Sequence, residues 1–490
     1  MPFFSLFFSH LKRLRGSSLF LALFLLVLIL GLSESLGASE LGADPRIEGQ
    51  KLSIFWVLPF VAMLLSIALF PLLASHFWER HYGKVSFFWA LVFIIPASLL
   101  INFQTAAYSL VHTVIEEYVP FIILLLALFA ISGGIRLKGS LNGTPTLNSI
   151  LLLIGSILAS LMGTTGASML LIRPFLAANT HRRYRVHTVV FFIFLVSNIG
   201  GSLTPLGDPP LFLGFLKGVT FFWTASHLWC QTLFLIVALL IIHFFIDSYL
   251  FKKEGRPSSP SSSEKFGLEG AYNFFLLLGV VGLVLLSGLW RSEGYVSIWG
   301  SIHYLFSDLT RDAGLIFLTF LTVAITPKAV RIANHFNWEP IKEVAKIFFG
   351  IFVTMIPAIA ILRAGQAGEL KCLIGLVTDA EGLPVDVAYF WLTGALSSFL
   401  DNAPTYLVFF NTAGGEAQSL MSQIPRTLAA ISCGAVFMGA NSYIGNAPNF
   451  MVRSISQSRG VKMPSFFGYL LWSCGILIPL FVIVSFIFFR

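Results

Sequence analysis

Two aspartates interrupt long apolar stretches of this sequence, and they are the first candidates for chemistry. Asp208 stands in the segment SNIGGSLTPLGDPP, and Asp401 stands in SFLDNAPT. An ionisable side chain at the centre of a membrane helix costs about 2.5–3.5 kcal/mol to insert, so we expect it to have a partner. A transported cation or proton is such a partner. Either aspartate could instead cap a short helix, because Pro209 directly follows the first and Pro404 lies three residues after the second.

Asn, Ser and Thr side chains accompany both aspartates in four segments rich in Gly and Pro, at 163–168, 197–210, 401–405 and 439–449. Residues of these types break helices and leave backbone carbonyls and amides without helical partners. Such oxygens suit Na⁺, and the amino ends of half-helices suit an anion. For cation or proton binding we single out Asp208, Asp401, Asn402, Asn198 and Asn446; the expected lining residues are Thr164, Thr165, Ser202, Thr204, Thr405, Asn441 and Ser442.

The two aspartates are interpreted as ligands of Na⁺ first and as proton carriers second. A helix amino terminus favours the ionised carboxylate, whereas a proton carrier should titrate near neutral pH. Each amide or hydroxyl, taken alone, could be an ordinary hydrogen bond between helices.

Composition defines the class of protein that must position these residues. Of the 490 residues, 56% are hydrophobic and 11% are charged, whereas soluble domains carry about 25% charged residues. A bilayer accommodates this much apolar sequence, so we predict an all-α polytopic membrane protein. The formal net charge of +8 comes from short loops between apolar runs, which indicates membrane topology and no nucleic-acid partner.

Polar residues elsewhere in the apolar runs are weaker candidates. The four cysteines show no CxxC spacing, so no metal cluster or disulfide framework is expected. His243 and Asp247 are spaced i, i+4 and could relay protons. Because they lie near the cytoplasmic end of their run, we expect a solvated pair.

The apolar runs long enough to cross a bilayer define the topology. They are 18–36, 54–75, 85–101, 119–135, 189–200, 229–249, 271–289, 313–325, 347–362, 427–440 and 465–489. With the amino terminus inside and the runs alternating in direction, most of the Lys and Arg clusters fall on the cytoplasmic side, as membrane proteins require. Basic clusters then flank 147–178 on the same side, so this stretch must enter and return as a re-entrant hairpin. The same alternation of crossings predicts that 387–410 enters from the outside and returns to the outside.

Two motifs recur across the middle of the chain at nearly one spacing. The tip at 164–168 aligns with 401–405, and the segment 207–212 aligns with 445–450, at offsets of 237 and 238 residues. We therefore predict two inverted-topology repeats, each with a re-entrant hairpin and a broken transmembrane helix. The expected organisation is a signal or extra helix with an outer loop (1–53), the first repeat (54–253), a cytoplasmic linker (254–266) and the second repeat (267–490).

At the motifs around Asn198 to Pro209 and Leu400 to Thr405, the chain resembles the ion transporter superfamily. This superfamily includes sodium/proton antiporters of the NhaD type, the arsenite pump subunit ArsB, and citrate and dicarboxylate carriers. The resemblance implies a scaffold and a moving transport domain in each protomer of a homodimer. Carboxylate carriers of the superfamily typically have Ser-Asn-Thr at both hairpin tips, whereas here Ser-Asn stands only at 197–198, after the first hairpin.

These features favour a Na⁺/H⁺ antiporter that works by alternating access in the bacterial inner membrane. Cation-coupled transport of citrate or a dicarboxylate is the alternative. A membrane-embedded enzyme is disfavoured because neither HExxH nor GxSxG occurs. No cofactor is expected beyond Na⁺ or H⁺ as coupling ions, and the expected partners are membrane lipid and a small ion or carboxylate.

Overall fold

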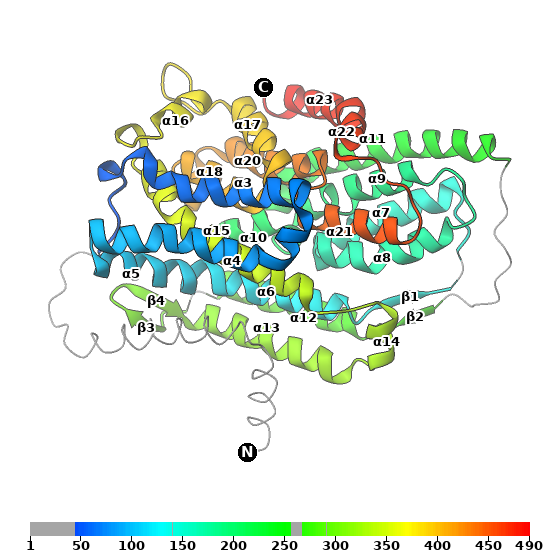
Figure 1. Cartoon of the computed structure of the whole chain (residues 1–490), viewed down its shortest axis with the longest axis horizontal. Coiled ribbons are helices and arrows are strands. Elements are labelled where there is room, and N and C mark those ends of the chain that lie inside the picture. The colour runs from blue at the N-terminus through cyan, green and yellow to red at the C-terminus, as the bar shows by residue number, and fades with distance from the viewer. Residues whose placement is uncertain (1–44, 140, 256–266, 291) are drawn as a thin grey trace.

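A computed structural model describes residues 45–139, 141–255, 267–290 and 292–490, and within these ranges the chain is mainly helical (Figure 1). The apolar run 18–36 and most of the expected linker lie outside the described residues. The helices before the linker are η1 (Gly49–Lys51), η2 (Ile54–Val57), α3 (Leu58–Leu73), α4 (Ser75–Pro96), η3 (Ala97–Ile101), α5 (Phe103–Thr113), η4 (Val114–Tyr118), α6 (Val119–Ser132), α7 (Pro145–Met162), α8 (Thr164–Ala178), α9 (Val186–Leu195), η5 (Ile199–Leu203), α10 (Pro209–Leu216) and α11 (Trp223–Lys253).

A comparable set of helices follows the linker. They are α12 (Asn273–Leu289), α13 (Phe306–Ile325), α14 (Lys328–Ala333), α15 (Glu339–Arg363), η6 (Gly365–Ala367), α16 (Lys371–Val377), α17 (Asp386–Phe399), α18 (Asn402–Thr412), α19 (Ala417–Ser422), α20 (Pro425–Met438), η7 (Gly439–Asn441), α21 (Ala447–Ser458), α22 (Phe466–Trp472), η8 (Ser473–Leu477) and α23 (Ile478–Phe488). Figure 1 shows α12 and α13 along one edge of the molecule and α16, α17, α22 and α23 along the opposite edge.

Eight helical segments of the described chain are long and apolar enough to cross a membrane. They begin with 54–71, 75–101, 103–132 and 145–162, and continue with 186–203, 223–253, 339–363 and 466–488. Many of their apolar side chains point outward, as Leu99 (79% exposed) and Leu471 (75%) do. Outward-facing apolar surface on this scale fits lipid, which confirms the prediction of a multi-pass membrane protein.

Two short antiparallel ribbons are the strands of the described chain, and the sequence prediction did not include them. Strand β1 (Arg136–Lys138) pairs with β2 (Gly267–Glu269), and β3 (Tyr295–Trp299) pairs with β4 (Ile302–Leu305). The β1–β2 ribbon joins the two sides of the linker, where Arg136 Nη1 donates to Glu269 Oε2 at 3.0 Å. Neither ribbon closes into a barrel, so the architecture remains helical.

Helix breaks occur where the Gly- and Pro-rich segments predict them. Helix α7 ends at Met162 and α8 begins at Thr164, and the two helices pack on each other. Gly163 between them has φ +81°, a backbone conformation that side-chain-bearing residues rarely adopt. Further breaks separate α9 from α10, α17 from α18 and α20 from α21. The breaks bring polar backbone and side chains into the buried core.

Candidate functional site

The carboxylate of Asp208 is the centre of the buried polar site. Its side chain is 1% exposed and accepts three hydrogen bonds from side chains. Thr164 Oγ1 donates to Oδ1 at 3.0 Å, Asn446 Nδ2 donates to Oδ1 at 3.1 Å, and Asn402 Nδ2 donates to Oδ2. The structure therefore brings together four residues that the sequence analysis singled out, from both sides of the linker.

Each of these residues stands at the amino end of a short helix. Thr164 is the first residue of α8 and Asn402 is the first of α18, while Asp208 and Asn446 occupy the N-cap positions of α10 and α21. Helix α10 packs against α18, and α21 packs against α8. A helix amino terminus carries a partial positive charge of about half a unit. Side chains at three such termini bind the carboxylate, and the fourth terminus begins the helix that follows Asp208, so the four together carry about two units of positive charge.

A network of asparagine amides holds the far side of the centre in place. Besides Asp208, the Asn446 amide donates to the backbone oxygen of Ser197 at 3.1 Å and to Asn198 Oδ1 at 3.2 Å. Asn198 donates in turn to Asn449 Oδ1 at 2.7 Å and to the Ile193 carbonyl at 2.8 Å. The predicted ligand Asn198 thus reaches Asp208 through Asn446 and makes no hydrogen bond with it. Its part in the described structure is to position that amide.

Asp401 makes no hydrogen bond with Asp208 and instead caps helix α18, whose first residue Asn402 does contact Asp208. The backbone N–H of Ala403 donates to Asp401 Oδ1 at 3.1 Å, as expected of an N-cap residue. Asp208 also occupies an N-cap position, but its side chain makes no capping bond and accepts from the three neighbouring helices instead. Capping therefore describes Asp401 and does not describe Asp208.

Two amide oxygens in the site lack a donor. Asn402 Oδ1 and Asn441 Oδ1 are both buried without a hydrogen-bond partner within the described parts of the chain. Asn402 binds Asp208 through its nitrogen, and the Asn441 nitrogen donates to Ser398 Oγ at 2.9 Å. Buried acceptors normally have a donor or a cation. These oxygens are the kind of ligand that a desolvated Na⁺ requires.

The remaining predicted residues mainly shape the breaks. The Thr204 hydroxyl donates to the carbonyl of Ser160, and the Ser442 hydroxyl donates to the carbonyl of Ser398. The two donors, Thr204 and Ser442, are 238 residues apart in sequence, and so are the two acceptors, Ser160 and Ser398. The hydroxyl of Ser202 contacts Thr232, that of Thr405 donates to the Asp401 carbonyl, and that of Thr165 makes no hydrogen bond within the described residues.

Ser160, Ser398 and Asn449 position the site but were not among the predicted residues. The Ser160 carbonyl accepts a bond from Thr204 in the break between α9 and α10, and the Ser398 carbonyl accepts one from Ser442 in the break between α20 and α21. Asn449 donates to the carbonyls of Gly439 at 2.8 Å and Ser442 at 2.9 Å. Asn449 falls within the repeated segment 445–450, and that recurrence was the available signal. A Ser in an apolar helix gives no comparable signal.

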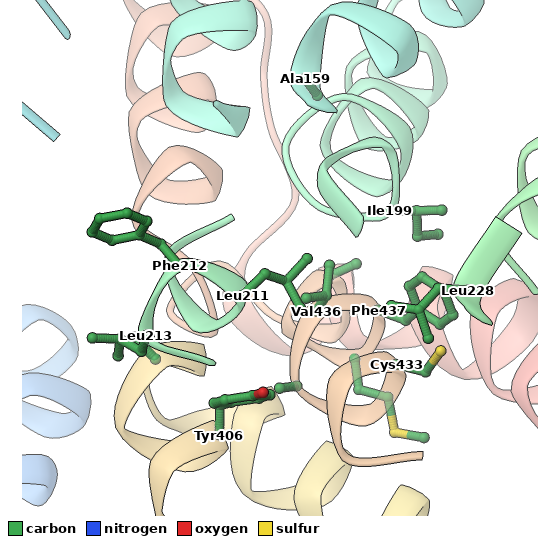
Figure 2. Close-up of a cluster of buried hydrophobic side chains, with 14 of the residues drawn as sticks. Ala159, Ile199, Leu211, Phe212, Leu213, Leu228, Tyr406, Cys433, Val436 and Phe437 are labelled. Atoms are coloured by element: carbon green, nitrogen blue, oxygen red, sulfur yellow. The ribbon is translucent and has the colours of Figure 1, made fainter. Parts of the chain in front are cut away.

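Apolar side chains enclose this polar centre. Figure 2 shows Leu211, Phe212 and Leu213 of α10 among Tyr406, Val436 and Phe437 from α18 and α20. Helix α10 approaches α18 so closely that a Cβ at Gly214 would lie 2.4 Å from the Tyr406 hydroxyl oxygen. The low-dielectric surroundings strengthen electrostatic interactions at the centre.

The protein has a lipid-facing helical exterior, and its buried polar centre is formed by breaks in helices. This arrangement is typical of a membrane transporter. Residues 49–489 match the family CitMHS_2, whose description reads "Putative citrate transport", and the chain belongs to this family. The match confirms the resemblance to the citrate and ion transporter superfamily and places the chain among transporters, which are not enzymes. No curated protein that was compared with the chain matches it.

Proposed function

We propose that the protein is a cation-coupled transporter of citrate or a related carboxylate. The observation that carries the proposal is the convergence of four helix amino ends on Asp208. Helix amino ends bind carboxylates, and the family is one of citrate transport. The sequence left two functions open, Na⁺/H⁺ antiport and cation-coupled carboxylate transport. The family match favours carboxylate transport.

Electrostatic balance in the site supports coupling to a cation. The partial charges of four helix termini sum to about +2, and Asp208 and Asp401 together contribute −2 when ionised. The site therefore has no surplus positive charge for a citrate carboxylate. A cation bound with the substrate supplies that charge, and the unpartnered oxygens of Asn402 and Asn441 are available as its ligands.

The architecture that goes with this proposal is a pair of inverted-topology repeats. The hydroxyl-to-carbonyl bonds that recur 238 residues apart support a duplication. The α7–α8 and α17–α18 pairs correspond to the predicted re-entrant hairpins. Alternating access would move these hairpins and breaks relative to the surrounding helices, in a homodimer within the bacterial inner membrane.

Na⁺/H⁺ antiport is the second candidate, and two acids at the site favour it. Asp208 is buried and Asp401 is half-buried, and two carboxylates in one site could exchange a cation for protons. Antiport requires that cation and proton compete for the same carboxylate, with no organic substrate.

The two candidates are separated by one preparation of proteoliposomes. Uptake of labelled citrate driven by an inward Na⁺ or H⁺ gradient supports the carboxylate transporter. Antiport instead predicts that Na⁺ dissipates an imposed pH gradient when no carboxylate is present. If citrate neither accumulates in the vesicles nor changes ion movement, the proposal of a carboxylate transporter is refuted.

A further inference from the structure

A second buried polar cluster lies apart from the Asp208 site, at the ends of α7 and α8 that face away from Gly163. We call it the inner cluster; its ionisable members are Arg182, His187, His243, Asp247 and Glu254. The side chains of Asp247 and His243 are fully buried, so the expectation of a solvated pair was wrong. Helix α11 continues to Lys253, and the segment 179–185 lies over this part of it.

Three members of the inner cluster are arranged as metal ligands would be. A ring nitrogen of His187, a ring nitrogen of His243 and a carboxylate oxygen of Asp247 lie within 4.8 Å of one another. His187 Nε2 is 2.9 Å from Asp247 Oδ1. His243 Nδ1 is 3.0 Å from the Ser149 hydroxyl, and His243 Nε2 is buried without any partner within the described chain.

Neighbouring groups orient these three side chains, as outer partners do in metal sites. Ser149 fixes the His243 ring through Nδ1 and leaves Nε2 available. Asn148 Nδ2 donates to Asp247 Oδ2 at 2.8 Å and leaves Oδ1 directed toward the histidine. Arg182 also contacts Oδ1, at 2.7 Å, but it is held independently by Glu254 and by the Gly143 carbonyl at 2.8 Å. The arginine would therefore stay anchored if Oδ1 bound a metal.

The charge of the inner cluster also favours a cation. Arg182 carries one positive charge, Asp247 and Glu254 carry two negative charges, and the imidazoles are neutral as ligands. One buried negative charge is left over, and such a charge is costly unless it is compensated. Two imidazole nitrogens and one carboxylate oxygen match Zn²⁺ and similar transition metals, whereas Na⁺, Mg²⁺ and Ca²⁺ prefer oxygen ligands alone.

We propose that His187, His243 and Asp247 form a binding site for a transition-metal dication such as Zn²⁺. Three protein ligands leave one position of a tetrahedral ion open for water. The ligands come from α9 and α11, so a bound ion would join these two helices beside the first hairpin. The site is independent of the proposed transport function and uses none of the residues around Asp208.

The test uses full-length protein in detergent, stripped of metal and titrated with Zn²⁺ and with Co²⁺ as a spectroscopic substitute. We expect one equivalent of bound metal per chain, the visible absorption bands of four-coordinate Co²⁺ and an increase in Tm on adding Zn²⁺. His243→Gln should weaken binding about 10- to 100-fold or more. It should still fold, because His243 Nε2 has no partner to lose within the described chain and the Gln amide can replace the contact of Nδ1 with Ser149.

His227→Gln is the matched control, because His227 lies on the same helix but contacts Trp223 and Ser226. It should bind metal like the wild type, and so should Asp208→Asn. Equal binding in His243→Gln and wild type would overturn the proposal, as would the absence of saturable binding. A Tm that responds to pH but not to Zn²⁺ would show that a proton neutralises the cluster, and it would overturn the proposal too.

Discussion

Replacing Asp208 by Asn should remove coupled transport while leaving the fold intact. The substitution deletes the charge at the centre of the site but keeps the size of the side chain. Its three donors come from three other helices, so the effect on transport reports directly on the proposed centre.

The effect on stability is expected to be small because two contributions oppose each other. A hydrogen bond to a charged group contributes about 1.5–3 kcal/mol and a neutral one about 0.5–1.5 kcal/mol, so three bonds lose about 3–5 kcal/mol in total. Relief from burying a carboxylate returns several kcal/mol. The new amide nitrogen takes the place of Oδ2, and once the Asn402 amide turns over it can donate to Asn402 Oδ1, which lacks a partner within the described chain. We expect a net change within about 2 kcal/mol.

The effect on the coupling cation should be much larger. Removing one charged partner from a buried pair costs about 2–5 kcal/mol, which corresponds to about a 30- to 5000-fold weaker affinity. In proteoliposomes, the Na⁺ concentration that gives half-maximal citrate uptake should rise by at least about 30-fold, or uptake should vanish. Tm measured on the same preparation shows whether the variant is folded.

Asp386→Asn is the matched control for this experiment. Asp386 is a half-buried aspartate at the start of α17, where it accepts a hydrogen bond from Thr427 at 2.6 Å. This variant should keep wild-type Na⁺ dependence. A folded Asp208→Asn protein with the Na⁺ dependence of the wild type would refute the assignment of the centre.

Three further substitutions test a helix break of the site, the inner cluster and the β1–β2 ribbon. Gly207→Ala would place a Cβ 2.1 Å from a backbone carbonyl oxygen of the same break, so unfolding should become easier by about 2 kcal/mol or more, measured by thermal denaturation. Arg182→Gln removes the buried cation that pairs with both Asp247 and Glu254, so a loss of about 3–5 kcal/mol is expected in the same assay. Glu269→Gln should cost less than about 1 kcal/mol, because that carboxylate is partly exposed. The Arg136 guanidinium lowers the pKa of Glu269, so its contribution is present at neutral pH and is lost as the pH falls through that lowered pKa.

The local features of the site could be predicted from the sequence because they depend on residues close together in the chain. Glycine at 163 and the prolines after 208 and 401 determine where helices end and begin. The N-cap role of Asp401 follows from the same local pattern. Each of these features needs only a few residues and the preferences of the backbone.

The partners of Asp208 could not be predicted, because they depend on how distant helices pack. Asn446 lies 238 residues from Asp208, and nothing in a single sequence specifies that its amide points toward the carboxylate. The burial of Asp247 was missed for the same reason. Its position near a basic helix end indicated solvent, but Arg182 from a distant loop covers it.

The two aligned segments on either side of the linker carry different residues at one position, and this difference matters at the Asp208 site. Asp208 and Asn446 occupy corresponding positions in the aligned segments, and the structure places them in direct contact at 3.1 Å. Two aspartates at this distance would repel each other unless they shared a proton. An amide at the second position instead donates to the carboxylate, so no second negative charge lies in direct contact with Asp208. One acid and one amide therefore allow the centre to bind a cation without first binding a proton.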